Sequence, residues 1–381
     1  MENIFTDSLN TYLENSFDET CKLLETLAAI PAPSHHEEKR AEFVKNWLTR
    51  QGADGVYIDE VFNVIYPVNC ENNNDLVVFM AHTDIVFPDT EPIKVTRDDT
   101  YYYAPGIGDD TTSLTLMLMI IKYIIKNNIK PSRGILFVAD SCEEGLGNLN
   151  GTRQLMQDFD GRITEFYTFD GKYPNICNKC VGSHRYEIEC LTEGGHSFNA
   201  FGKANAIHKL SELICDLFTV EVPVMGDSKT TYNVGVIEGG TSVNTIAQKA
   251  KVLYEYRSDN IDCLEIMKNT FEEKINKANQ ASDVEFKVNI LGIRPCGGKI
   301  DELKHKAMCD RVLEIQERHS GMKGFAKSGS TDCNIPMSLG VPAVCCGNYL
   351  GDRTHTREER IVIESLKVGL KITAEIILGI Y

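Results

Sequence analysis

The 381-residue sequence lacks an excess of basic residues, because 39 Lys and Arg stand against 55 Asp and Glu, a formal net charge of −16. Such a chain has little means to neutralise phosphates, so we expect no nucleic-acid partner. It also lacks a long apolar run. The longest, residues 114–125, is interrupted by Thr115, Lys122 and Tyr123 and is too short to span a bilayer, so we expect no membrane partner.

We also expect no secretory signal, since the first residues have neither a basic region nor an apolar one. The 13 cysteines form no paired framework, which predicts reduced thiols and a cytoplasmic location. Cys177 and Cys180 make a single C-x-x-C, without the second pair that a zinc knuckle requires. We interpret both as ordinary thiols and keep a thiol-redox protein as an alternative.

The apolar fraction of 42% and the charged fraction of 25% are those of a globular protein, and the length suits two domains. Apolar strand-like runs alternate with helical patterns, which predicts an α/β sheet that is mixed but largely parallel, with helices on both faces. Ser34 and Glu37 form a capping-box pattern that predicts a helix start. The strand-like runs are residues 75–81, 134–139, 165–169 and 342–346, and the helical runs are residues 37–50, 112–127 and 366–378.

The middle of the chain follows another order, β-α-β-β-α-β, which is typical of a ferredoxin-like α+β unit. We therefore predict a discontinuous catalytic domain of residues 1–183 and 294–381, with a lid or dimerisation domain of residues 184–293 inserted in it. The inserted runs are residues 184–192, 204–218, 231–237, 250–257, 261–278 and 283–290.

Polar residues of metal-ligand type follow each buried strand of the predicted catalytic domain. The carboxyl ends of parallel strands meet at one edge of a sheet, so we expect these residues to converge there. Read singly, Asp109 would be a helix cap and Glu143 with Glu144 a solvated turn. The residues are His82 and Asp84 after the first strand, Glu143 and Glu144 after the second, Asp170 after the third, His355 after the fourth, and Asp109 before the helix of residues 112–127.

Such a cluster of acids is costly without cations. Two carboxylates about 4 Å apart repel by roughly 4 kcal/mol at an effective dielectric constant near 20. Two divalent ions balance the charge of three ligating carboxylates and one hydroxide. Imidazole mixed with carboxylate favours zinc, with manganese or cobalt as other candidates.

This constellation resembles the co-catalytic zinc exopeptidase family that includes peptidase T, aminoacylase, glutamate carboxypeptidase and succinyl-diaminopimelate desuccinylase. The resemblance extends over nearly the whole chain, with the motifs in the family's order. It implies that Asp109 bridges two zinc ions, that His82 and Asp170 complete one site, and that Glu144 and His355 complete the other. It also implies that Glu143 is the general base and that Asp84 orients His82.

The same resemblance assigns roles outside these motifs. His196, in the G-G-H-S segment, would polarise the scissile carbonyl across a homodimer formed by the inserted domain. Asn244 and Arg257 would bind substrate, although Arg257 could simply pair with a nearby acid. Asp332 would line the cleft, or only cap a turn.

The resemblance implies a di-zinc hydrolase of small amides, which we expect to be a cytoplasmic aminopeptidase or di/tripeptidase that acts on small peptides. By the resemblance, an aspartate at position 170 (Asp170) favours an aminopeptidase. Asp110 stands near the place where peptidase T-like members have a Lys, which argues against peptidase T itself. An N-acyl amino acid deacylase or a carboxypeptidase is the alternative enzyme. An inactive metal-binding scaffold is the alternative of another class.

Overall fold

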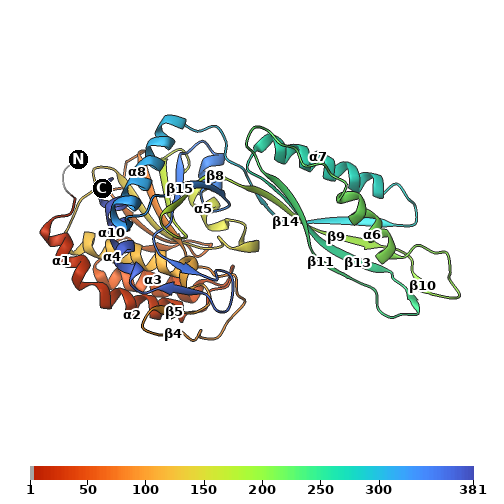
Figure 1. Ribbon diagram of the computed structural model, residues 1–381, viewed down its shortest axis with the longest axis horizontal. Coiled ribbons are helices and arrows are strands. Elements are labelled where there is room, and N and C mark those ends of the chain that lie inside the picture. Colours follow the sequence, from red (N-terminus) through yellow and green to blue (C-terminus); the bar gives the residue numbers. More distant parts are fainter. Residues whose placement is uncertain (1–3) are drawn as a thin grey trace. The chain divides into compact units, whose positions relative to one another are not determined.

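The computed structural model describes residues 4–381, which form two compact units (Figure 1). One unit contains residues 4–179 and Lys299–Tyr381, and the other contains Cys180–Gly298. Within the described residues, no helix has the length and apolar character needed to cross a membrane.

The first unit is built on an eight-stranded sheet in the order β1-β2-β6-β3-β7-β16-β8-β15. Its four central strands, β6, β3, β7 and β16, run parallel to one another, and β2 and β8 are antiparallel to their neighbours. All residues of β3 and β6 are buried, as expected for strands covered on both faces. The strands are β1 (Tyr57–Ile58), β2 (Val64–Val68), β3 (Leu76–His82), β6 (Gly134–Asp140), β7 (Ile163–Phe169), β8 (Asn175–Cys180), β15 (Phe325–Gly329) and β16 (Ala343–Cys346).

Helices cover both faces of this sheet, which confirms the predicted α/β class. Successive residues of β3 point to opposite faces. Phe79 belongs to the core that the α4 helix helps to form, and Met80 Sδ lies 3.6 Å from the Thr152 hydroxyl of α5 on the other face. The helices are α1 (Asp7–Asn15), α2 (Phe17–Ala28), α3 (Glu38–Gln51), α4 (Ser113–Lys126), α5 (Asn150–Asp158), α8 (Glu302–Ser320), α9 (Asn334–Ser338) and α10 (Ser365–Leu378).

A small second sheet in this unit has the order β17-β18-β5-β4. It brings the segment before α4 next to the segment before α10, because β5 pairs with β18. Two loops that carry predicted site residues are thereby joined. The strands are β4 (Thr96–Arg97), β5 (Tyr101–Tyr103), β17 (Gly351–Asp352) and β18 (Arg360–Val362).

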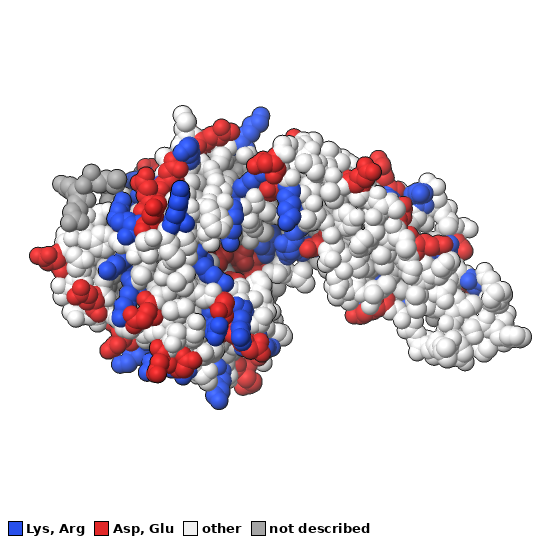
Figure 2. All heavy atoms as spheres, in the orientation of Figure 1, with Lys and Arg blue, Asp and Glu red and all other residues white. Residues whose placement is uncertain are grey.

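The second unit is an antiparallel sheet in the order β11-β13-β9-β14, packed against two helices. Its β-α-β-β-α-β chain order is the predicted ferredoxin-like arrangement. Figure 2 shows that the end near β10 and β12 is largely uncharged on the visible face. The elements are β9 (Gly182–Leu191), β10 (Gly195–His196), α6 (Ala206–Leu217), β11 (Thr230–Gly239), β12 (Thr245–Ile246), β13 (Lys249–Ser258), α7 (Ile261–Ala278) and β14 (Glu285–Arg294).

The predicted capping box at Ser34 and Glu37 is wrong. Helix α3 begins at Glu38 without a side-chain cap. The Ser34 hydroxyl instead donates a hydrogen bond of 2.6 Å to Asp84, and the buried Glu37 carboxylate accepts one of 2.9 Å from the Cys142 backbone N–H. Both side chains point to the loops that follow β3 and β6, because those loops contain buried polar groups that need partners.

Candidate active site

The ligand-type residues lie where the parallel strands end. His82 is the last residue of β3, and Asp170 directly follows β7. Glu143 and Glu144 lie in the loop after β6. The other two residues are Asp109, whose own backbone is not helical, in the turn Ile107–Thr112 before α4, and His355, in the loop between β17 and β18.

The Asp109 carboxylate lies at the centre of the cluster. Its Oδ1 is 3.0 Å from His82 Nε2, and its Oδ2 is 3.1 Å from His355 Nε2. His355 Nε2 is also 3.2 Å from Glu144 Oε1. Each oxygen of a single carboxylate therefore faces a different imidazole, which is the arrangement that a ligand shared by two cations requires.

Three groups of side chains place their ligand atoms within 4.8 Å of one another. Two of the groups share Asp109, so they define two adjacent sites with one common carboxylate. The third places Glu143 beside ligands of both sites. The groups are His82, Asp109 and Asp170; Asp109, Glu144 and His355; and His82, Glu143 and Glu144.

The charges in this cluster are poorly balanced by protein groups alone. Burial and the Asp109 charge raise the pKa of Glu144 to about 7, and they raise the pKa of Asp170 well above its ordinary value. Burial also acts to raise the pKa of Asp109, but hydrogen bonds with His355 and His82 lower it below its ordinary value. Hydrogen bonds with Asp109 and Glu144 raise the pKa of His355 to about 11. Without metal ions, the close approach of these acids and imidazoles therefore depends on protons bound to them.

Two divalent cations fit this set of residues, because they would replace those protons and supply the missing positive charge. Each group that contains Asp109 offers one imidazole and two carboxylates. This mixture suits zinc and also manganese or cobalt.

Asp84 is fully buried and supports residues of the cluster through hydrogen bonds. Its carboxylate accepts hydrogen bonds of 3.0 Å from the backbone N–H groups of Glu143 and Glu144, in addition to the one from Ser34. His82 Nδ1 lies 3.1 Å from the Asp84 carbonyl oxygen and 3.4 Å from its carboxylate. Asp84 therefore holds both the His82 ring and the loop with the two glutamates.

Glu359 is a supporting residue that the sequence analysis missed. Its buried carboxylate accepts hydrogen bonds of 2.9 to 3.0 Å from the backbone N–H groups of Gly106, Gly108 and Asp109. At Gly108 a β-carbon would lie 2.8 Å from the Tyr349 ring and 2.9 Å from Glu359, so glycine is required there. Nothing in the local sequence around Glu359 points to a partner so far away.

Arg40 is a second missed residue, on α3. Its guanidinium is buried and donates hydrogen bonds to the carbonyl oxygens of Thr83 and Ile30 and to the Thr111 hydroxyl. It joins the segment after β3 to the turn that carries Asp109. On a helix surface of mixed charge, nothing in the sequence distinguishes it from an exposed arginine.

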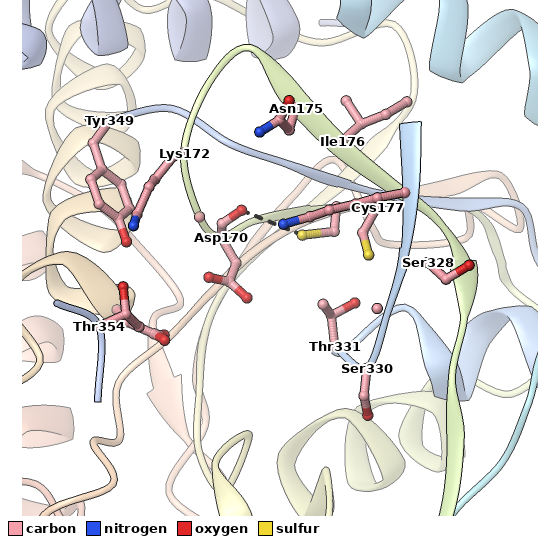
Figure 3. A pocket seen from close by; sticks show the side chains of 15 residues that line it. Asp170, Lys172, Asn175, Ile176, Cys177, Ser328, Ser330, Thr331, Tyr349 and Thr354 are labelled. Carbon is pink, nitrogen blue, oxygen red and sulfur yellow. Dashed lines mark hydrogen bonds between the residues drawn. The ribbon is translucent and has the colours of Figure 1, made fainter. Parts of the chain in front are cut away.

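A cavity of about 340 Å³ opens beside the cluster, against Asp109 and Asp170 (Figure 3). Its other walls come from the segment after β7, from β8 and β15, and from the loop before α9. Lining residues from these segments include Lys172, Asn175, Ser330 and Thr331. Space for part of a substrate therefore lies next to the candidate metal ligands.

Asp332 does not line this cavity, although its neighbour Thr331 does. Its side chain is 1% exposed and accepts a hydrogen bond from the Thr152 hydroxyl. Burial and the nearby Glu143 charge raise the pKa of Asp332 to about 7.

The remaining predicted residues lie in the second unit. The exposed His196 accepts a hydrogen bond of 3.3 Å at Nδ1 from the Phe198 backbone N–H, and the exposed Asn244 accepts one from the Ser242 hydroxyl. Arg257 donates two hydrogen bonds of 3.0 Å to Glu255. Of the two interpretations of Arg257, pairing with a nearby acid is the one seen in this conformation.

Comparisons with known proteins identify the family of the chain. The model of peptidase family M20/M25/M40 matches residues 78–379. The uncharacterised protein YqjE of Bacillus subtilis is 26% identical over 381 residues, 93% of this chain and 95% of that protein. Succinyl-diaminopimelate desuccinylase of Corynebacterium glutamicum is 23% identical over 355 residues, 90% of this chain and 92% of that enzyme. The crystal structure of aminopeptidase PepT from Bacillus cereus has a TM-score of 0.70 and 22% identity, over 96% of this chain and 98% of that one.

Proposed function

Because the chain belongs to peptidase family M20/M25/M40, it is a metal-dependent hydrolase of amide bonds, and we propose that it is an aminopeptidase or a di/tripeptidase of small peptides. The observation that carries this proposal is the position of Asp109, whose two oxygens face His82 and His355 separately. His82 and Asp170 would hold one cation with Asp109, and Glu144 and His355 would hold the other. We assign zinc to both sites because of the mixed imidazole and carboxylate ligands.

When bound, the two cations make a water molecule more acidic and polarise the scissile carbonyl. Glu143 takes a proton from the attacking water and later delivers it to the leaving amine. Asp84 holds the Glu143 backbone and the His82 ring, so that base and ligand keep their positions. Asp332, which is buried and accepts a hydrogen bond from Thr152, would act through its neighbours as a positioning residue.

Cleavage at a free amino terminus is supported by the aspartate at position 170 and by the structural likeness to aminopeptidase PepT. The likeness to the desuccinylase of Corynebacterium glutamicum favours an N-acyl amino acid deacylase as the second candidate. An inactive metal-binding scaffold would have no need for a buried Glu143 beside both groups of ligands, so we place it last.

We also propose a homodimer formed by the inserted unit, with His196 reaching the partner subunit's active site. Several large apolar side chains near His196 are exposed, among them Phe198 at 85% and Phe201 at 90%. The edge strand β11 likewise exposes Val236 and Ile237. Large apolar side chains exposed in such number are typical of an interface. Asn244, in the neighbouring turn, would contact the substrate in such a dimer, and Arg257 would bind substrate after release from Glu255.

A cytoplasmic location completes the proposal. All 13 cysteines have free thiols, and Cys177 and Cys180 are buried in β8. Reduced thiols persist in the cytoplasm and are rare in oxidising compartments.

The proposal is tested by metal analysis of the purified chain together with hydrolysis of a free tripeptide and of an N-acetyl amino acid. Two zinc ions per chain and cleavage of the tripeptide alone are expected. Cleavage of the N-acetyl substrate alone would establish the deacylase instead. Bound metal without turnover of any amide would favour the scaffold.

A further inference from the structure

We propose that the cavity beside Asp109 and Asp170 is a subsite for a carboxylate group of the substrate, held by the ammonium groups of Lys172 and Lys327. This inference rests on the proposed function and narrows it to peptides with an anionic group near the scissile amide.

The position of the cavity is the first argument. Asp109 and Asp170 form part of its wall, so a group bound in it lies next to the site of hydrolysis. Lys172 follows Asp170 by two residues, and Lys327 is on β15 at the edge of the main sheet. Figure 3 shows Lys172, Asp170 and Thr331 around the same space. The volume of about 340 Å³ is that of a small-ligand pocket.

The charge of the cavity is the second argument. Among the described residues, neither Lys172 nor Lys327 takes part in an ion pair, whereas many other lysines do. Asp352 is an acid near Lys172, since hydrogen bonds with Arg360 and, more weakly, the Lys172 charge lower its pKa, but Arg360 already binds it with hydrogen bonds of 2.8 and 3.0 Å. Asp109 and Asp170 would be neutralised by the cations they bind. Two positive charges then remain for a ligand.

The other lining groups suit the same ligand. Asn175 offers an amide donor, and Ser328, Ser330 and Thr331 offer hydroxyl groups. A carboxylate accepts such hydrogen bonds on both oxygens, and bonds to ionised groups are about twice as strong as neutral ones. A cationic side chain would be repelled by two lysines. An aliphatic side chain would remove the ammonium groups from water and offer them no hydrogen bond in exchange.

The carboxylate can belong to the amino-terminal side chain of the peptide, to the next side chain, or to the carboxyl terminus. Three matched pairs of substrates separate these sources. They are Glu-Ala-Ala against Gln-Ala-Ala, Ala-Glu-Ala against Ala-Gln-Ala, and Ala-Ala-Ala against its carboxyl-terminal amide. We expect the acid of one pair to be cleaved about tenfold faster in kcat/KM, which is the effect of a single charge-assisted hydrogen bond.

The variants Lys172→Met and Lys327→Met test the lysines themselves. Each is expected to raise KM for the favoured acid about tenfold, to change kcat little and to leave its neutral partner unaffected, as for loss of a binding contact. Lys323→Met is the matched control, since Lys323 is exposed, precedes β15 and does not line the cavity.

The outcomes of this experiment separate the two proposals. If peptides are cleaved but no pair shows a preference for the acid, or the preference survives in both lysine variants, the subsite is wrong and the peptidase assignment stands. If no amide is cleaved, the proposed function fails, and titration calorimetry with glutarate and the neutral glutaramide decides the subsite. Binding of glutarate that both variants weaken supports it, and equal binding in all variants overturns it.

Discussion

Glu359 Oε1 accepts a hydrogen bond of 2.9 Å from the backbone N–H of Asp109, 250 residues earlier in the chain. The same carboxylate accepts two more bonds from the N–H groups of Gly106 and Gly108. Burial raises the pKa of Glu359 to about 7, although these N–H groups oppose that change. A single buried side chain from the β18 segment thus fixes the turn that presents the shared carboxylate.

Replacement of Glu359 by Gln tests this support. A glutamine offers one acceptor oxygen and one NH2 group, so at least one N–H of the turn would face another donor. An unsatisfied buried group costs about 1–3 kcal/mol. We expect zinc affinity, measured by competition with a chelator, to fall about 10- to 100-fold, as for other residues that support metal ligands.

Glu358→Gln is the control for this variant, because Glu358 is the adjacent residue and is exposed. Its zinc affinity should equal that of the wild type. Equal affinity in both variants would show that the turn holds Asp109 without Glu359.

The fold was largely predictable because strong local patterns determine it. The strands β3 and β6 are continuous apolar runs, and α6 and α7 have apolar faces with helical spacing. The short strands β17 and β18 have no such pattern. The pairing of β18 with β17 and with β5 depends on tertiary contacts, and the sequence alone does not reveal it.

Most of the candidate ligands were predictable for the same reason, since they stand directly after a buried strand or before a buried helix, whereas His355 follows β16 only after a loop and the short strand β17. The groups that support them were not. Ser34 and Glu37 match a capping box in sequence, and only the burial of the loops after β3 and β6 decides against it. Arg40 and Glu359 bind backbone groups of distant loops, which leave no spacing in the sequence to recognise. Lys172 and Lys327 likewise could not be singled out from the sequence, because only the structure shows that both line the cavity.

The two adjacent glutamates should respond differently to the same substitution. Glu143→Gln removes the proposed base, so turnover of a tripeptide should fall about 10²- to 10⁴-fold while both metal ions stay bound. Glu144→Gln removes a proposed ligand, so metal analysis should find about one ion fewer per chain. Loss of metal from Glu143→Gln with full metal content in Glu144→Gln would exchange the two roles.

Zinc affinity should depend on pH in a defined direction. The metal-free site holds a proton on Glu144, whose pKa is about 7, and another on His355, whose pKa is about 11. Burial and the Asp109 charge raise the pKa of the proposed ligand Asp170, and, although burial opposes this, hydrogen bonds with Asp109 and Asp84 raise that of His82, so these ligands also bind protons that zinc must displace. Below about pH 7 zinc must displace the Glu144 proton as well, so affinity rises with pH and rises more steeply below pH 7. Competition with chelators from about pH 5.5 to about pH 8.5 measures this curve. Glu144→Gln should lose the steeper part, and one constant slope in the wild type would contradict the prediction.

The proposed dimer depends on exposed aromatic side chains. The double variant Phe198→Ser and Phe201→Ser should shift the protein to a monomer in sedimentation velocity, because it removes apolar surface that only an interface would bury. Leu303→Ser is the control, since Leu303 is 83% exposed but lies on α8 of the other unit. A wild-type monomer, or a dimer that survives the double variant, would contradict this interface.

The action of His196 across the dimer can be tested by mixing two inactive variants. A His196→Ala chain keeps Glu143 but lacks the histidine, and a Glu143→Gln chain keeps the histidine but lacks the base. If His196 serves the partner subunit's site, a mixed dimer contains one complete site, built from the Glu143 of one chain and the His196 of the other. After equal mixing and exchange of subunits, activity should recover to about a quarter of the wild-type value, because half of the dimers are mixed and each has one working site. If each histidine serves its own chain, neither site of a mixed dimer is complete, and the mixture stays as inactive as its components.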